Sequence, residues 1–155
     1  INTGNITLSN PNETTVLYIS NGEADDLIIN SIIFNFGTST GGTGDFFTNV
    51  YRQPTSGDII TNANDVDVIA NLNHGSNRPV AFSAYKGASG EAIVSGGTLE
   101  LPSIFHAGTS RQVIPIESIV LPTGTSIAVN ITPQASNTSW AVNVAASCHV
   151  QTTEL

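Results

Sequence analysis

The chain has 155 residues, a net charge of −8, only four basic side chains and a pI near 4.4. Such an acidic surface repels phosphate backbones and anionic headgroups, so we expect neither nucleic acid nor a membrane as a partner. A mass of 16.1 kDa suits one domain with its own core, and the single cysteine, Cys148, has no partner for an internal disulfide.

The N-terminal segment, residues 1–13 (INTGNITLSNPNE), is polar and rich in turn-forming residues. It carries little strand signal, so we expect an extended arm that orders on a neighbouring molecule and stays outside the core. The domain then spans residues 14–155. The arm residues expected to make contacts with a neighbouring molecule or a second subunit are Ile1, Asn2, Thr3, Asn5, Ile6 and Leu8.

Beyond the arm, turn-forming residues recur every eight to twelve positions between short apolar runs, and no window repeats apolar residues at helical spacing. The expected strands are 14–20, 27–36, 45–53, 65–70, 79–86, 99–101, 112–116, 118–121, 126–132 and 140–150. This pattern predicts an all-β chain that folds as a two-sheet antiparallel β-sandwich, jelly-roll-like, with eight to ten strands.

Alternation is clearest in the last expected strand. One face carries Trp140, Val142, Val144, Ala146, Cys148 and Val150, and the other carries Ala141, Asn143, Ala145, Ser147 and His149. The first set is expected to point into the core, with Cys148 as a buried thiol. In 126–132, Ile127, Val129 and Ile131 are expected to face inward and Asn130 outward.

No motif predicts catalysis. The glycine-rich stretch 37–44 lacks the lysine and following helix of a phosphate-binding loop. His74, His106 and His149 show no metal-ligand spacing, although a triad assembled in space stays open at this point. We therefore expect no enzyme, no catalytic residue, no metal and no cofactor.

Two further groups of residues admit a binding role. Asp65 and Asp67 lie on one side of an expected strand and could hold calcium, but solvated carboxylates are favoured. The aromatic residues Tyr18, Tyr51, Tyr85 and Trp140 could stack on sugars. Core packing is favoured for them, because Trp140 alternates with core positions.

Six segments, in this order, resemble small virion structural proteins of tailed bacteriophages. They are 36–45 (FGTSTGGTGD), 52–57 (RQPTSG), 70–76 (ANLNHGS), 84–87 (AYKG), 121–129 (LPTGTSIAV) and 132–138 (TPQASNT). Each segment alone consists of turn-forming residues and is weakly specific, whereas the ordered set is more specific. The resemblance spans roughly residues 16–150.

The resemblance implies a capsid decoration or cement protein that sits on the capsid surface, over junctions between major capsid subunits, as a homotrimer. Its partners would be the major capsid protein and itself, and assembly would take place in the host cytoplasm before the protein resides in the virion. The alternative is a receptor- or carbohydrate-binding head of a phage fibre or adhesin, and a secreted trimeric ligand-like jelly roll comes next.

Overall fold

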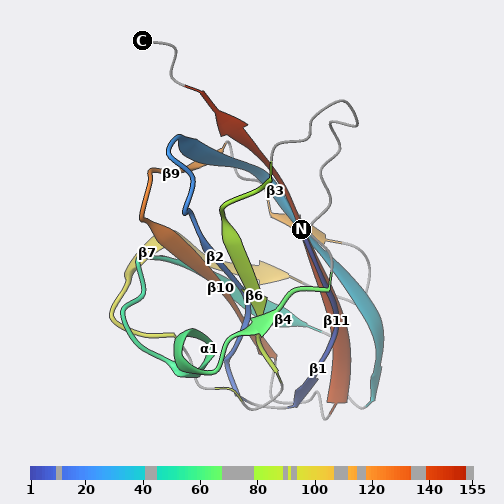
Figure 1. Cartoon of the computed structure of the whole chain (residues 1–155). Coiled ribbons are helices and arrows are strands. Elements are labelled where there is room, and N and C mark those ends of the chain that lie inside the picture. Colours follow the sequence, from blue (N-terminus) through green and yellow to red (C-terminus); the bar gives the residue numbers. More distant parts are fainter. Residues whose placement is uncertain are drawn as a thin grey trace.

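The structure is a computed structural model that describes residues 1–9, 12–40, 45–67, 79–88, 91, 94–106, 112–114, 118–133 and 139–152. Within these residues the chain forms eleven strands and one four-residue helix, arranged as two facing antiparallel sheets (Figure 1). The predicted β-sandwich is therefore confirmed. No helix in this part of the chain is long and apolar enough to cross a membrane.

Sheet A contains β1 (Asn2–Ser9), β11 (Ser139–Gln151), β3 (Asp26–Thr40), β8 (Gln112–Ile114) and β9 (Ile119–Leu121). Its order is β1-β11-β3, with β8 and β9 both pairing with β3 at different points along its length. The long strands β3 and β11 form the middle of this sheet, and Figure 1 shows them running side by side.

Sheet B contains β5 (Asn64–Asp65), β6 (Ser83–Lys86), β2 (Thr14–Ser20), β10 (Ser126–Pro133), β4 (Phe46–Arg52) and β7 (Thr98–His106), in that order. The short helix α1 (Asp58–Thr61) follows β4 and packs on the outer side of this sheet.

The strand pairing is nested. β1 pairs with β11, β2 with β10, β3 with β8 and β9, and β4 with β7. A chain that folds back on itself in this way, with its strands divided between two sheets, has the connectivity of a jelly roll. The described residues form one strand more than the ten expected, because β1 adds to the count.

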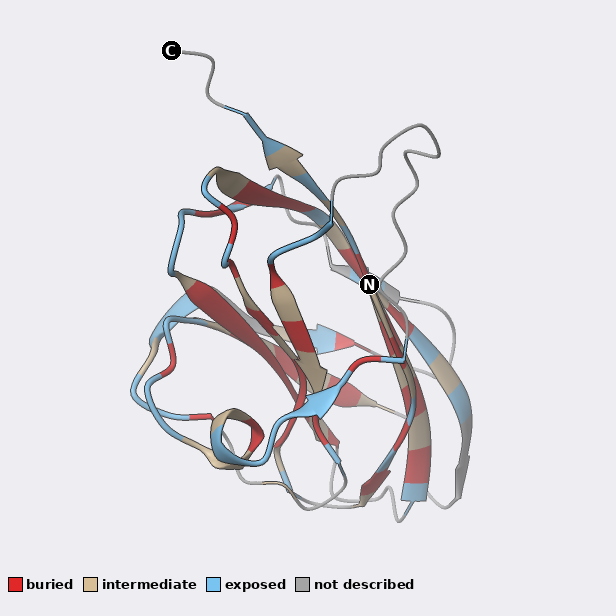
Figure 2. Ribbon diagram, viewed as in Figure 1, coloured by how far each residue is buried: buried red, intermediate tan, exposed pale blue. Residues whose placement is uncertain are grey.

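The core lies between the sheets and contains side chains from both. Figure 2 shows buried residues along the strands of both sheets. In β11, Trp140, Val142, Val144 and Ala146 are buried, as their alternation predicts. Trp140 stacks on Phe36 at a ring-centroid distance of 4.4 Å. The predicted strand 14–20 coincides with β2, and the predicted inward positions of β10, Ile127, Val129 and Ile131, are all buried.

The prediction of an N-terminal arm outside the core is wrong. β1 pairs with β11 along the edge of sheet A, and Ile6 and Leu8 belong to the core cluster. A register shift between Asn2 and Asn5, with Gly4 at φ 66°, places Thr3 and Ile6 on the same buried side although they are three residues apart. This bulge hides the period of two, so the segment does not read as a strand.

Some predicted features lie partly or wholly outside the described residues. The strand expected at 65–70 is described only to residue 67, and the strand expected at 112–116 only to residue 114. His74 also lies outside the described residues. The glycine-rich connection 37–44 is shorter than expected, because β3 continues to Thr40; residues 41–44 are again outside the described part.

Candidate functional site

The outward side of sheet A forms an uncharged face. Along β3 and β11 the register pairs Ile33 with Ala145, Asn35 with Asn143, and Ile28 with His149. Their neighbours along each strand point into the core, so these side chains point away from it. The uncharged face comprises Asn5, Thr7, Ile28, Ser31, Ile33, Asn35, Val113, Val120, Ala141, Asn143, Ala145, Ser147 and His149.

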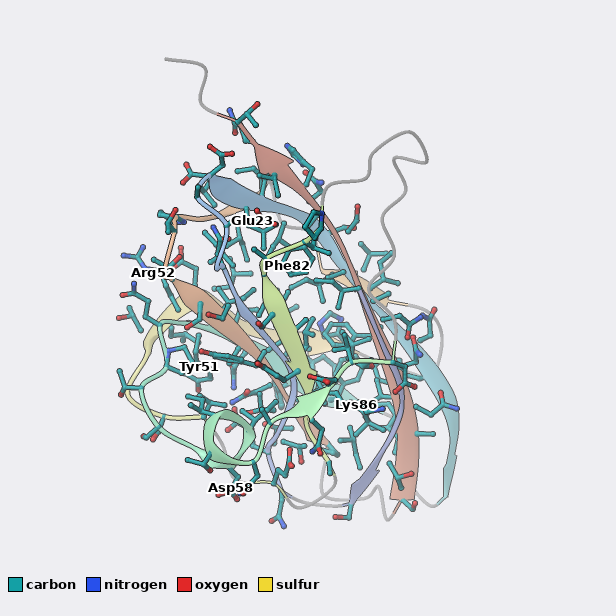
Figure 3. All side chains as sticks on the ribbon, in the orientation of Figure 1. Glu23, Tyr51, Arg52, Asp58, Phe82 and Lys86 are labelled. Carbon is teal, nitrogen blue, oxygen red and sulfur yellow. The ribbon has the colours of Figure 1, made fainter. Side chains whose placement is uncertain are left out.

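The absence of charge from this face contrasts with the rest of the molecule. Among the outward-facing residues that the structure describes on sheet A, Asp26 at the first position of β3 carries the only charged side chain. The other described acidic and basic side chains belong to sheet B, to α1 or to connecting segments. In Figure 3, Arg52 and Asp58 lie well away from β3 and β11.

Two exposed valines mark one edge of the uncharged face. Val113 on β8 lies opposite Ile33 and is 49% exposed, and Val120 on β9 lies opposite Ile28 and is 50% exposed. Across the sheet the row from Val113 continues through Ile33 to Ala145. Aliphatic and small side chains in transverse rows give a surface that another protein can approach closely without burying a charge.

Asparagine side chains occupy the middle of the uncharged face. Asn35 on β3 and Asn5 on β1 both lie opposite Asn143 on β11. Asn143 donates from Nδ2 to Oδ1 of Asn2 at 2.7 Å. Each asparagine offers both donors and acceptors, so such a row can form hydrogen bonds with polar groups of another copy.

The structure separates the six predicted contact residues. Thr3, Ile6 and Leu8 are buried within the chain itself, so their side chains cannot make the contacts predicted for them. Ile1 and Asn2 are partly exposed, and Asn5 is exposed on the uncharged face. Alternation from Asn5 to Leu8, together with the bulge that returns Thr3 to the buried side, explains the split.

Of the two expected binding groups, the carboxylates do not form a metal site among the described residues, and the aromatic residues divide between the core and the outer side of sheet B. Asp65 and Asp67 are exposed, and Asp67 forms an ion pair with Lys86. No three His, Cys, Asp or Glu side chains within the described ranges are grouped as a metal ion would need. Trp140 is in the core, whereas Tyr18, Tyr51 and Tyr85 form a row on the outer side of sheet B with Ala128 between them.

The two described histidines lie on different sheets. His106 is buried on the inner side of sheet B, stacked on Phe46 at 4.5 Å, with Nε2 3.0 Å from Thr48 Oγ1. His149 lies on the outer side of sheet A, where Nδ1 is 3.1 Å from Asn30 Nδ2. The fold therefore does not bring these two histidines into one site.

Asn130 of β10 is expected to face outward, and the structure agrees only in part. It lies on the outer side of sheet B as predicted, but it is fully buried. Its Nδ2 donates to Glu13 Oε1 at 3.0 Å, and Asn49 Nδ2 donates to the same oxygen at 3.3 Å. Burial, and then the nearby Glu13 carboxylate, raise the pKa of the Tyr51 hydroxyl above its ordinary value.

Cys148 is partly exposed on the inward side of β11, less buried than the sequence pattern predicts. Burial still raises the pKa of its thiol, and the N-terminal ammonium of Ile1 acts in the opposite direction. A thiol with a raised pKa is largely protonated near neutral pH and is a poor nucleophile.

Comparison with known proteins gives no relative: no protein-family model and no curated protein matches the chain.

The sequence analysis did not predict the uncharged face. Five of its thirteen residues are visible as the second set of alternating residues in 140–150, but Ile28, Ile33, Val113 and Val120 join it only through strand pairing.

Proposed function

We propose that the chain is a structural component of a bacteriophage virion, a decoration or cement protein that self-associates through the uncharged face of sheet A and stabilises the capsid surface. The resemblance to small phage virion proteins supplies the biological setting. Apart from Asp26 at the start of β3, the described outward residues of sheet A carry no charge, and this observation supports the self-association.

The physical case rests on where two copies of an acidic protein can touch. With a net charge of −8, copies repel through most of their surfaces. Burying unpaired carboxylates would add a desolvation cost of several kcal/mol for each ion. The uncharged face avoids both penalties, and its size is sufficient. The strands of sheet A contain 42 residues. At a rise of about 3.3 Å per residue and a strand spacing of about 4.8 Å they cover on the order of 700 Å², near the ~800 Å² that one partner contributes to a standard interface.

The trimer, the major capsid protein as partner and the position over capsid subunit junctions come from the resemblance and form part of the proposal. A symmetric trimer suits a cement protein, because several weak contacts from one particle act together and gain avidity. The rigid two-sheet core would hold those contacts in a fixed arrangement.

The test has two stages. The mass of the purified chain in solution should be three times 16.1 kDa. The chain should then co-sediment with shells built from the major capsid protein of the same genome and raise their resistance to heat. A trimer that does not bind these shells would contradict the cement role and favour the alternative, a receptor- or carbohydrate-binding head.

A matched set of variants tests the face itself. Val113→Glu and Val120→Glu each add a charge to the uncharged face at an exposed position, so they should abolish self-association without unfolding the monomer. Val80→Glu is the control, because Val80 is similarly exposed, at 44%, but precedes β6 in sheet B. If all three variants behave alike, the contact lies elsewhere.

A further inference from the structure

The outer side of sheet B carries an exposed aromatic pair that the proposed function does not use. β4 presents Phe47, Asn49 and Tyr51 on this side, since side chains of a strand alternate between its two sides. Phe105, on the edge strand β7, lies opposite Phe47, and the two ring centroids are 5.2 Å apart. Phe105 is 52% exposed, so the pair is open to solvent.

Two tyrosines of this side, in contrast, pack on a hydrophobic cluster. Ile59 of α1 and Val94 are buried against Ala128 of β10, and Tyr18 and Tyr85 pack on this small cluster. Tyr18 and Tyr85 also stack on each other at 6.1 Å. The Phe47–Phe105 pair belongs to neither hydrophobic cluster of the described residues.

Fixed hydrogen-bond acceptors adjoin the aromatic pair. Glu13 Oε1 is held by the amides of Asn49 and Asn130, and Asn130 is fully buried. From the described residues no hydrogen bond reaches Glu13 Oε2 or Asn49 Oδ1, although both side chains are only partly buried. Two acceptors therefore remain available beside an open ring, at positions that the sheet fixes.

An aromatic ring beside fixed acceptors fits a molecule with one apolar face and a rim of hydroxyl donors. Phe47 and Asn49 are two residues apart on β4, about 7 Å, which one or two sugar rings can span. The charge of −8 disfavours acidic sugars. We propose that Phe47, Phe105, Asn49 and Glu13 form a binding site for a neutral sugar, whose C–H face lies on Phe105 and whose hydroxyls donate to Glu13 and Asn49.

This site goes beyond the proposed function, because it lies on the opposite sheet from the uncharged face and needs neither the trimer nor the capsid. Saturation-transfer NMR on the whole chain tests it, with a panel of glucose, galactose, mannose, N-acetylglucosamine and their disaccharides. We expect saturation transfer to the C–H protons of at least one sugar. A panel without any saturation transfer would overturn the proposal.

Phe105→Leu locates the site, because leucine keeps an apolar side chain at this position but removes the ring. We expect the dissociation constant to rise by at least about fivefold. Val80→Ala is the matched control, because Val80 is also exposed, at 44%, but precedes β6, which lies far from β7 in the strand order of sheet B; it should leave sugar binding unchanged. A patch that docks another protein would tolerate leucine at this position, whereas a sugar that stacks on the ring would not. Undiminished sugar binding by Phe105→Leu therefore overturns the assignment of the sugar site to this aromatic pair.

Glu13→Gln provides a second variant that leaves both phenylalanines in place. It removes the carboxylate and should weaken binding of the same sugar by a similar factor, with the fold checked by thermal unfolding. Sugar binding that is insensitive to both variants would show that the ligand binds elsewhere on the chain.

Discussion

Asn143 and Asn2 are joined across the β11–β1 pair by a hydrogen bond of 2.7 Å from Nδ2 of Asn143 to Oδ1 of Asn2. The same Oδ1 accepts the backbone N–H of Gly4 at 2.8 Å. One side-chain oxygen thus connects the bulge in β1 to the neighbouring strand. This contact allows β1 to leave and regain its register without leaving buried backbone groups unpaired.

Asn2→Ala should therefore destabilise the fold although the side chain is partly exposed. It removes two hydrogen bonds, each worth about 0.5–1.5 kcal/mol, so we expect a loss of about 1–2 kcal/mol in the free energy of unfolding. Urea unfolding followed by circular dichroism measures it. A variant as stable as the original chain would contradict the role given to Asn2.

Leu8→Ala tests whether β1 belongs to the core. Leu8 is 0% exposed, and removing a buried leucine side chain costs about 2–5 kcal/mol. Thr7→Ala is the matched control, because Thr7 is exposed on the opposite side of the same strand and should change stability by less than about 0.5 kcal/mol. Equal stability of the two variants would mean that β1 acts as a detachable arm after all.

Much of the fold follows from local patterns. The alternation in β10 and β11 predicts their extent and their buried sides, because each keeps a regular pleat over most of its length. For β2 only the extent is predicted. β1 escaped prediction because its bulge breaks the alternation between Thr3 and Ile6. Only the pairing with β11 shows that this polar, turn-rich segment is a strand.

The candidate site was less predictable, for a physical reason. A face of a sheet joins residues from strands that are far apart in the chain: Val113, Ile33 and Ala145 become neighbours through two strand pairings. Asn130 shows the same limit, because alternation gives its side of the sheet but not its burial by Glu13 and Asn49.

Cys148 should react slowly with iodoacetamide at pH 8. Burial raises its pKa, so the thiolate fraction is smaller than in a free cysteine and the rate should be several-fold lower. Because the folded pKa is raised, the associated stability is present below the unfolded pKa and is lost as pH rises through the folded pKa. Alkylation followed by mass spectrometry measures the rate. A rate equal to that of a free thiol would contradict the burial of Cys148.

The pKa of the Tyr51 hydroxyl should depend on the charge of Glu13. Burial and the Glu13 carboxylate raise the pKa of its hydroxyl, so Glu13→Gln should lower that pKa toward the ordinary value of 10.0. The stability linked to protonated Tyr51 is present below its unfolded pKa and is lost as pH rises through the folded one. The difference in tyrosinate absorbance between the variant and the original chain, recorded against pH, measures the shift. Superimposable titrations would place Glu13 away from the ring.

The mass of the chain in solution, measured by light scattering together with its Val113→Glu and Val120→Glu variants, tests the central claim most directly. We predict three times 16.1 kDa for the original chain and for Val80→Glu, and 16.1 kDa for the two variants on the uncharged face. A chain that stays at 16.1 kDa at all concentrations, or a trimer that survives both charged substitutions, would contradict self-association through sheet A.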